Sequence, residues 1–149
     1  MARDRATRAR HLARELLVKA LYQWQIAGHG VQELEAQFSA AEGFERCDAD
    51  YFGALLTTIV GDARALDQLI ARYAVRSIEQ LDAVGRAVLL LGLAELKHRA
   101  DVPTKVAINE AIELAKRYGT TDSHKFVNAV LDRAARELER EPSARERKS

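Results

Sequence analysis

The chain has 149 residues, of which 48% are hydrophobic and 30% charged, with a net charge of +1. This balance is typical of one folded domain large enough to bury a core, and it argues against a disordered or fibrous protein. A single cysteine, Cys47, excludes an intramolecular disulfide, and the longest apolar run, residues 87–94, is much shorter than a membrane span. Together with the charged start MARDRATRARH, which is unlike a secretory leader, these features predict a cytoplasmic protein.

The first part of the chain predicts two helices. Apolar residues between Leu12 and Trp24 recur at three- and four-residue steps, which is the pattern of an amphipathic helix, and Gly28 ends it. A short second helix is predicted over residues 31–38, and a loop over residues 39–47.

A long third helix is predicted as one element from Asp48 to Ile70, because its apolar residues keep a helical period throughout. It contains Gly53 and Gly61, each of which costs about 1 kcal/mol in a helix interior. We therefore expect close contacts with neighbouring helices at both glycines. A break over residues 75–81, with capping-box spacing inside it, ends this part of the chain.

Three further helices are predicted in the second half. Residues 82–99 are apolar on nearly every side, which indicates a central, buried helix. The next helix begins near Pro103 and stops at Gly119, residue types typical of a helix start and a helix end. The last helix has an apolar face over residues 126–138, and the charged, nonperiodic stretch 139–149 predicts a disordered tail.

Six or seven helices with mostly short links predict an all-α helical bundle that forms a single domain over residues 1–138. The loop at 39–47 and the break at 75–81 would allow this bundle to divide into two small packed halves.

No pattern for catalysis or metal binding emerges from the sequence. The four histidines are scattered, one cysteine cannot build a thiolate cage, and the glycines are too isolated for a phosphate loop. Cys47 lies among acidic residues, which disfavours a reactive thiolate. We therefore expect no enzymatic activity, no cofactor and no metal.

A polar turn before the last helix combines a carboxylate, an imidazole, an ammonium and a phenyl ring: Asp122, His124, Lys125 and Phe126. Single-stranded RNA is recognised by stacking on aromatic rings, by hydrogen bonds to base edges and by cations near phosphates. Each residue also has a simpler interpretation. Asp122 is a preferred helix N-cap, Phe126 fits an apolar helix face, and His124 and Lys125 suit a solvated surface.

Arginines of the first helix form a second candidate group: Arg8, Arg10 and Arg14. The net charge is +4 over residues 1–19, −6 over residues 31–62 and +3 over residues 97–149. A chain with this segregation can present a positive face to a polyanion while staying almost neutral. The arginines either bind a nucleic-acid backbone or are ordinary surface charges, and periodicity alone does not join them to the turn.

Four blocks of sequence resemble the NusB family of transcription antitermination factors. They are ARELLVKALYQW, DADYFGALL, VPTKVAINEAIELAK and SHKFVNAVLD, and the resemblance spans about residues 8–135. It implies an all-α fold of two three-helix subdomains. It also implies pairing with NusE, a small-subunit ribosomal protein, to bind boxA, a single-stranded element of nascent RNA. That complex joins other Nus factors on RNA polymerase and suppresses termination, notably in ribosomal RNA operons.

By position, the resemblance implies RNA contacts for Arg8, Arg10, Arg14, Asp122, Lys125 and Phe126, to which the chemistry of the turn adds His124. It implies a surface for NusE at Tyr22, Gly85 and Val88. The chain departs from the family where Gly85 replaces a common glutamate and Leu90 a common arginine. The first change removes an ion-pair partner for NusE, and the second makes the buried helix more apolar.

Two other interpretations belong to different classes of protein. Related helical domains present substrate to RNA cytosine methyltransferases, although no methyltransferase domain follows in this chain. Alternatively, the chain only assembles with itself through apolar surface left by Leu90 and Ala94. We expect a monomer or a homodimer.

Overall fold

The computed structural model describes residues 2–74 and 81–138. Within these ranges the chain forms seven α-helices, one 3-10 turn and no strand, which confirms the all-α prediction. The predicted capping box inside the 75–81 break and the predicted tail lie outside the described residues. The elements in chain order are α1 (Ala2–Ala27), α2 (Val31–Ser39), η1 (Phe44–Arg46), α3 (Ala49–Gly61), α4 (Ala63–Tyr73), α5 (Ala83–His98), α6 (Thr104–Tyr118) and α7 (Ser123–Glu137).

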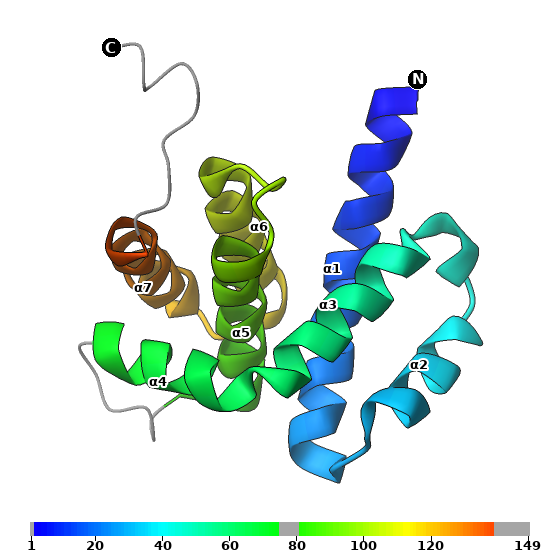
Figure 1. Cartoon of the computed structure of the whole chain (residues 1–149), viewed down its shortest axis with the longest axis horizontal. Helices are drawn as coiled ribbons and strands as arrows, with labels where there is room; N and C mark the ends of the chain where they lie inside the picture. Colours follow the sequence, from blue (N-terminus) through cyan, green and yellow to red (C-terminus); the bar gives the residue numbers. More distant parts are fainter. Residues whose placement is uncertain (1, 75–80, 139–149) are drawn as a thin grey trace.

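The helices form two groups that meet along α1 and α5 (Figure 1). One group contains α1, α2 and α3, and the other contains α4, α5, α6 and α7. As predicted, α5 is the central helix: eleven of its sixteen residues are buried, and it contacts α1, α3, α4, α6 and α7. The first turns of α1, residues 2–8, are exposed and project beyond the rest of the bundle.

The single long helix predicted from Asp48 to Ile70 is wrong, because the chain breaks at Asp62 between α3 and α4. The Asp62 carboxylate lies 2.8 Å from Lys97 Nζ and 2.7 Å from His98 Nε2, so the break is tied to the end of α5. Lys97 and His98 hold the pKa of Asp62 below its usual value, although partial burial acts in the opposite direction. Periodicity continues across the break because both helices bury one apolar face.

The prediction of close helix contacts is wrong at Gly61, and at Gly53 it holds only for one side chain of α2. A Cβ atom at Gly61 would meet nothing within 4 Å, and one at Gly53 would approach only the Glu35 carboxylate, at 3.3 Å. Close packing occurs instead at Gly92 in α5, where a Cβ atom would lie 2.7 Å from Leu131 Cδ1 of α7. Glycine therefore allows the tight approach of the central helix to α7.

No helix in the described part of the chain is long and apolar enough to cross a membrane.

Candidate nucleic-acid interface

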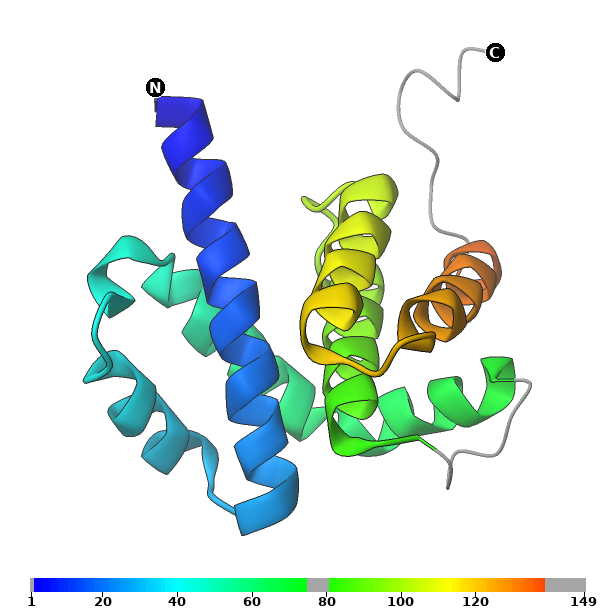
Figure 2. The same cartoon turned by 180° about the vertical axis from the view of Figure 1, so that it is seen from behind.

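Helices α1 and α6 lie side by side on the face shown in Figure 2, and a groove of about 350 Å³ runs between them. Its lining includes Lys116 and Arg117 of α6 and His11 of α1. The two helices are joined at one end of this groove through Glu15. Its carboxylate lies 3.2 Å from Arg117 Nη1 and accepts a hydrogen bond of 3.0 Å from the Tyr118 hydroxyl.

The exposed side of α1 continues this face along the helix. Steps of three, four and seven residues place Arg8, Glu15, Lys19 and Tyr22 along one side of the helix. Lys19 Nζ lies 5.8 Å from the centre of the Tyr118 ring on α6. Sequence reasoning did not place Lys19 and Tyr118 on this face, because their grouping depends on how α1 packs against α6.

The polar turn begins between α6 and α7 with Asp122 and continues into the first turn of α7, which contains His124, Lys125 and Phe126. Short local contacts hold this segment. Ser123 Oγ donates a hydrogen bond of 2.9 Å to the carbonyl of Thr120. Gly119 ends α6 as predicted, but its backbone is extended rather than left-handed. Glycine is required here for space, since a Cβ atom would lie 2.3 Å from Ser123 Oγ and 2.7 Å from the Ala115 carbonyl.

Asp122 occupies the position before α7, but within the described residues its side chain accepts no capping hydrogen bond. The capping interpretation is therefore wrong. The carboxylate instead lies 3.7 Å from Lys125 Nζ, with side chains 78% and 75% exposed respectively. Both charges are thus at the surface, where an ion pair is weak and easily exchanged for a ligand contact.

Phe126 and His124 are half-buried beside these exposed charges. Phe126 packs against the edge of the core without being enclosed by it, so part of the residue faces solvent. The turn therefore brings one aromatic residue, one carboxylate and one ammonium to the surface within five positions of the chain.

The three candidate arginines of α1 have different environments. Arg8 is exposed, whereas Arg10 is half-buried, with Nη2 3.0 Å from Asp101 Oδ2 and its guanidinium 4.2 Å from the centre of the Tyr51 ring. Two positions along an α-helix differ by about 200° around its axis, so Arg8 and Arg10 point to different sides of α1. Arg10 lies near the α5–α6 loop rather than over the groove.

Arg14 is buried inside the bundle. Its Nε lies 2.9 Å from Glu95 Oε2, and its Nη1 lies 3.4 Å from Glu110 Oε1. Burial by itself lowers the pKa of Arg14, but Glu95, Tyr51 and Glu110 more than compensate and raise it. The assignment of Arg14 to the RNA surface therefore needs correction: its charge is used within the fold.

Glu95 is the centre of this buried network, which sequence reasoning missed. The Tyr51 hydroxyl of α3 donates a hydrogen bond to the same carboxylate oxygen that Arg14 contacts. Burial raises the pKa of Glu95, while Arg14 and Tyr51 lower it in part. In the sequence, the only sign of this network was Glu95 itself, the single acid within the apolar α5. The network joins α1, α3 and α5 across the boundary between the two helix groups.

The three residues assigned to the NusE surface are not equally accessible. Tyr22 is 42% exposed, but Gly85 and Val88 are buried, so they cannot contact a partner directly in this structure. Sequence reasoning missed Ile26, which is 64% exposed one helical turn beyond Tyr22. A Cβ atom at Gly85 would lie 2.7 Å from Asp82 Oδ1, so an acidic side chain there would displace the residues that begin α5.

Leu90 and Ala94 are fully buried within the chain. The self-assembly surface expected from them is therefore wrong. In the described part of the chain there is also no group of three or more metal-ligating side chains.

Comparison with known proteins places this architecture in one family. A sequence model of the NusB family matches residues 11–136. The chain belongs to the NusB family. The resemblance of its four sequence blocks to this family is thus confirmed.

Relatives within the NusB family cover most of the chain. Those from Alcanivorax borkumensis and Yersinia pestis are named transcription antitermination protein NusB. They are 49% and 48% identical, covering 87% and 94% of this chain and 87% and 97% of their own. A solved structure of NusB from T. maritima is 35% identical with a TM-score of 0.75, covering 91% of this chain and 94% of that one.

Proposed function

We propose that this chain is an RNA-binding transcription antitermination factor that acts without catalysis. Together with NusE it would bind single-stranded boxA RNA in nascent transcripts, join other Nus factors on RNA polymerase in the cytoplasm and promote elongation. The observation that carries this proposal is the turn before α7. Its Asp122 carboxylate is exposed and is not used as a cap, and it lies beside Lys125 and Phe126.

Each part of the surface has a separate role in the proposal. Part of Phe126 is accessible for stacking on a base, and Asp122 can accept a hydrogen bond from a base amino or imino group. Lys125 and His124 lie where they can approach phosphates close to that base. Arg8, Lys116 and Arg117 supply positive charge along the α1–α6 face. Arg10 lies outside this face, paired with Asp101 of the α5–α6 loop, and would contact RNA only where the strand extends beyond the face.

We infer a protein-binding role for the other end of α1. Tyr22 and Ile26 are large apolar residues exposed one turn apart, beside the start of α5. The side chain of Gln25, between them in sequence, donates a hydrogen bond of 2.8 Å to the Ala83 carbonyl, which fixes α1 against α5 there. We propose Tyr22 and Ile26 as the accessible part of the NusE surface. Gly85 and Val88 are buried beneath this surface, so they would affect NusE binding only indirectly, through the position of the α5 backbone.

The decisive experiment is binding of labelled boxA-type single-stranded RNA against a scrambled RNA of equal length, with and without NusE. We expect preference for boxA, tighter binding when NusE is present, and strong dependence on salt. For about three phosphate contacts, log K should fall with log[salt] with a slope of about −2. Equal affinity for both RNAs in the presence of NusE would overturn the proposal.

A further inference from the structure

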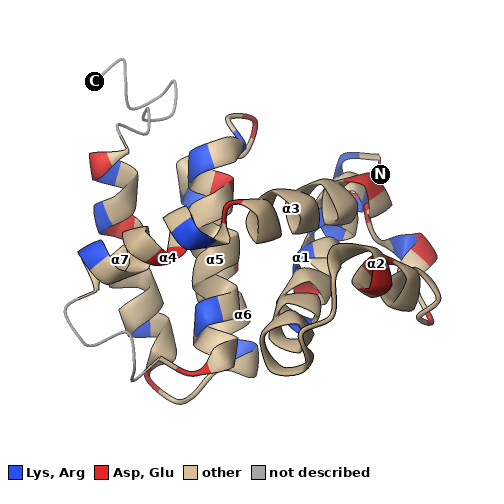
Figure 3. Cartoon of the chain, turned by 60° about the horizontal axis from the view of Figure 1, so that its bottom comes forward, with Lys and Arg blue, Asp and Glu red and all other residues tan. Residues whose placement is uncertain are grey.

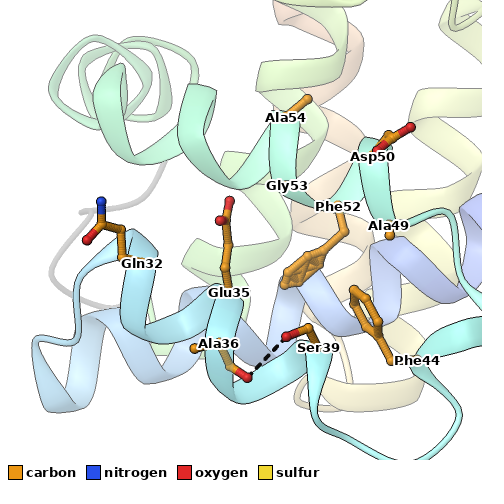
Figure 4. Close-up of a pocket in the computed structure, with 10 residues that line it drawn as sticks. All are labelled: Gln32, Glu35, Ala36, Ser39, Phe44, Ala49, Asp50, Phe52, Gly53 and Ala54. Atoms are coloured by element: carbon orange, nitrogen blue, oxygen red, sulfur yellow. Dashed lines mark hydrogen bonds between the residues drawn. The ribbon is translucent and has the colours of Figure 1, made fainter.

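A second groove lies on the other side of α1, between α2 and α3, with a volume of about 520 Å³ (Figure 4). The rings of Phe44 and Phe52 lie at one end, with centres 5.9 Å apart in an edge-on arrangement. Glu35 of α2 and Asp50 of α3 are among the lining residues, and the Glu35 carboxylate points towards α3. The groove therefore combines acidic residues with an apolar end, where half-buried Phe44 packs against buried Phe52.

Small residues keep this groove open. The facing walls carry Ala36 on α2 and Gly53 on α3, and the Glu35 carboxylate extends from α2 towards Gly53. Glycine in the interior of α3 costs about 1 kcal/mol in helix propensity, and no helix backbone packs against Gly53. The glycine leaves room for the Glu35 carboxylate to lie against α3, since an added Cβ atom would approach it to 3.3 Å, and it keeps side-chain bulk out of the groove.

The charge of this region is strongly one-sided. Residues 31–62 contain seven acids and one base, and Figure 3 shows acidic segments on α2 and beside it. Asp48 and Asp62 are paired with Arg10 and Lys97. The other acids form no ion pair with a described residue: Glu33, Glu35, Glu42, Glu45 and Asp50. Such a surface repels RNA and attracts basic protein segments.

We propose that the α2–α3 groove docks a lysine- or arginine-rich segment of a partner protein. Basic side chains of that segment contact Glu35 and Asp50, and an apolar side chain inserts beside Phe44 and Phe52. Because α1 separates this groove from the α1–α6 face, RNA and the basic segment are bound at the same time (Figures 1 and 2). This inference goes beyond the proposed RNA-binding function and does not depend on it.

The test uses the full chain labelled with 15N and a short synthetic peptide of lysine, arginine and leucine. Two matched peptides serve as controls, one with serine in place of leucine and one with glutamate in place of the basic residues. We expect the first peptide to shift the amide signals of Glu35, Gly53 and Ala54, and both control peptides to bind more weakly.

Three variants locate the binding. Glu35→Gln should weaken peptide affinity about two- to fivefold, as expected for a partly exposed ion pair, and Gly53→Leu should abolish binding by filling the groove. The matched control is Glu113→Gln, which neutralises an α6 carboxylate that is 66% exposed and should leave the affinity unchanged. Thermal unfolding establishes that each variant is folded, and all three should retain a folded bundle.

Amide shifts outside the groove, or equal weakening by Glu35→Gln and Glu113→Gln, would overturn the proposal. So would unchanged peptide binding by folded Gly53→Leu. A groove occupied by a second copy of this chain would instead appear as concentration-dependent sedimentation that Gly53→Leu abolishes, and this too overturns the proposal. RNA affinity, measured on the same samples, reports separately on the α1–α6 face.

Discussion

The turn at residues 122–126 and the network around Glu95 use similar side chains for different purposes. Each combines carboxylate, cation and aromatic ring: Asp122, Lys125 and Phe126 in the turn, and Glu95, Arg14 and Tyr51 in the network. In the turn the charges are exposed and weakly paired, so they are available to a ligand. In the network they are buried and hydrogen-bonded, and removing the Arg14 cation takes away the ion pair that offsets burial of the Glu95 carboxylate. Burial, rather than residue type, separates a binding role from a structural one.

The largest effect expected from this comparison is on stability. Arg14→Ala should lower the free energy of unfolding by about 3–5 kcal/mol, because the buried Glu95 carboxylate would lose its 2.9 Å ion pair with Arg14. Urea denaturation measures the loss. Arg8→Ala is the matched control on the same helix, and it should change stability by less than about 0.5 kcal/mol because Arg8 is exposed. Equal losses of unfolding free energy in the two variants would show that the buried Arg14 stabilises the fold no more than the exposed Arg8 does.

Phe126→Ala should have its main effect on RNA. If a base stacks on the ring, affinity for boxA-type RNA should fall by about 1–3 kcal/mol. Loss of the buried part of the ring should also cost up to about 2 kcal/mol of folding stability. Phe44→Ala provides a matched control, since Phe44 is another half-buried aromatic packed on the core. It should lose comparable stability but keep full RNA affinity, and a folded Phe126→Ala protein with unchanged RNA affinity would exclude stacking.

A smaller change is expected when one exposed charge of the turn is removed. Lys125→Ala should reduce the magnitude of the salt slope by about 0.7, the value for one phosphate contact with a single strand. Fluorescence anisotropy over a range of salt concentrations measures this slope. Arg72→Ala, at an exposed cation on α4, should leave the slope unchanged. Identical slopes for the two variants would place Lys125 outside the RNA contact.

The smallest expected effect concerns pH and the α3–α4 break. Because Lys97 and His98 lower the pKa of Asp62, its contribution to stability is present above the unfolded-state pKa and is lost as pH falls through the folded-state pKa. The contribution should be below about 1 kcal/mol, since the pair is partly exposed. Urea midpoints measured from pH 7 down to about pH 2 should fall less steeply for Asp62→Asn than for the unchanged chain. If the urea midpoints of the two proteins fell in parallel as pH is lowered, the pairing of Asp62 with Lys97 and His98 would not stabilise the break.

The helices themselves could largely be predicted from the order of residues along the chain. Apolar spacing identified α1, α2, α6 and α7, and the apolar composition of residues 82–99 identified α5 as the buried centre. The same spacing gave no sign of the turn at Asp62, because two consecutive helices that bury one face can share a single period. The polar turn was located only in part: Asp122 lies between α6 and α7, whereas His124, Lys125 and Phe126 belong to the first turn of α7.

The sequence by itself therefore determined the class of fold, the central helix and the family, all of which depend on local periodicity or on contiguous blocks of residues. Only the tertiary structure decided that Arg14 is buried, that Val88 lies beneath the surface and that the Asp122 side chain makes no capping hydrogen bond. It also brought α6 beside α1 to form a groove. Periodicity describes one helix at a time, whereas the environment of a charged side chain depends on which distant helices pack around it. Arg14 illustrates this, since its partner Glu95 is 81 positions away in the chain.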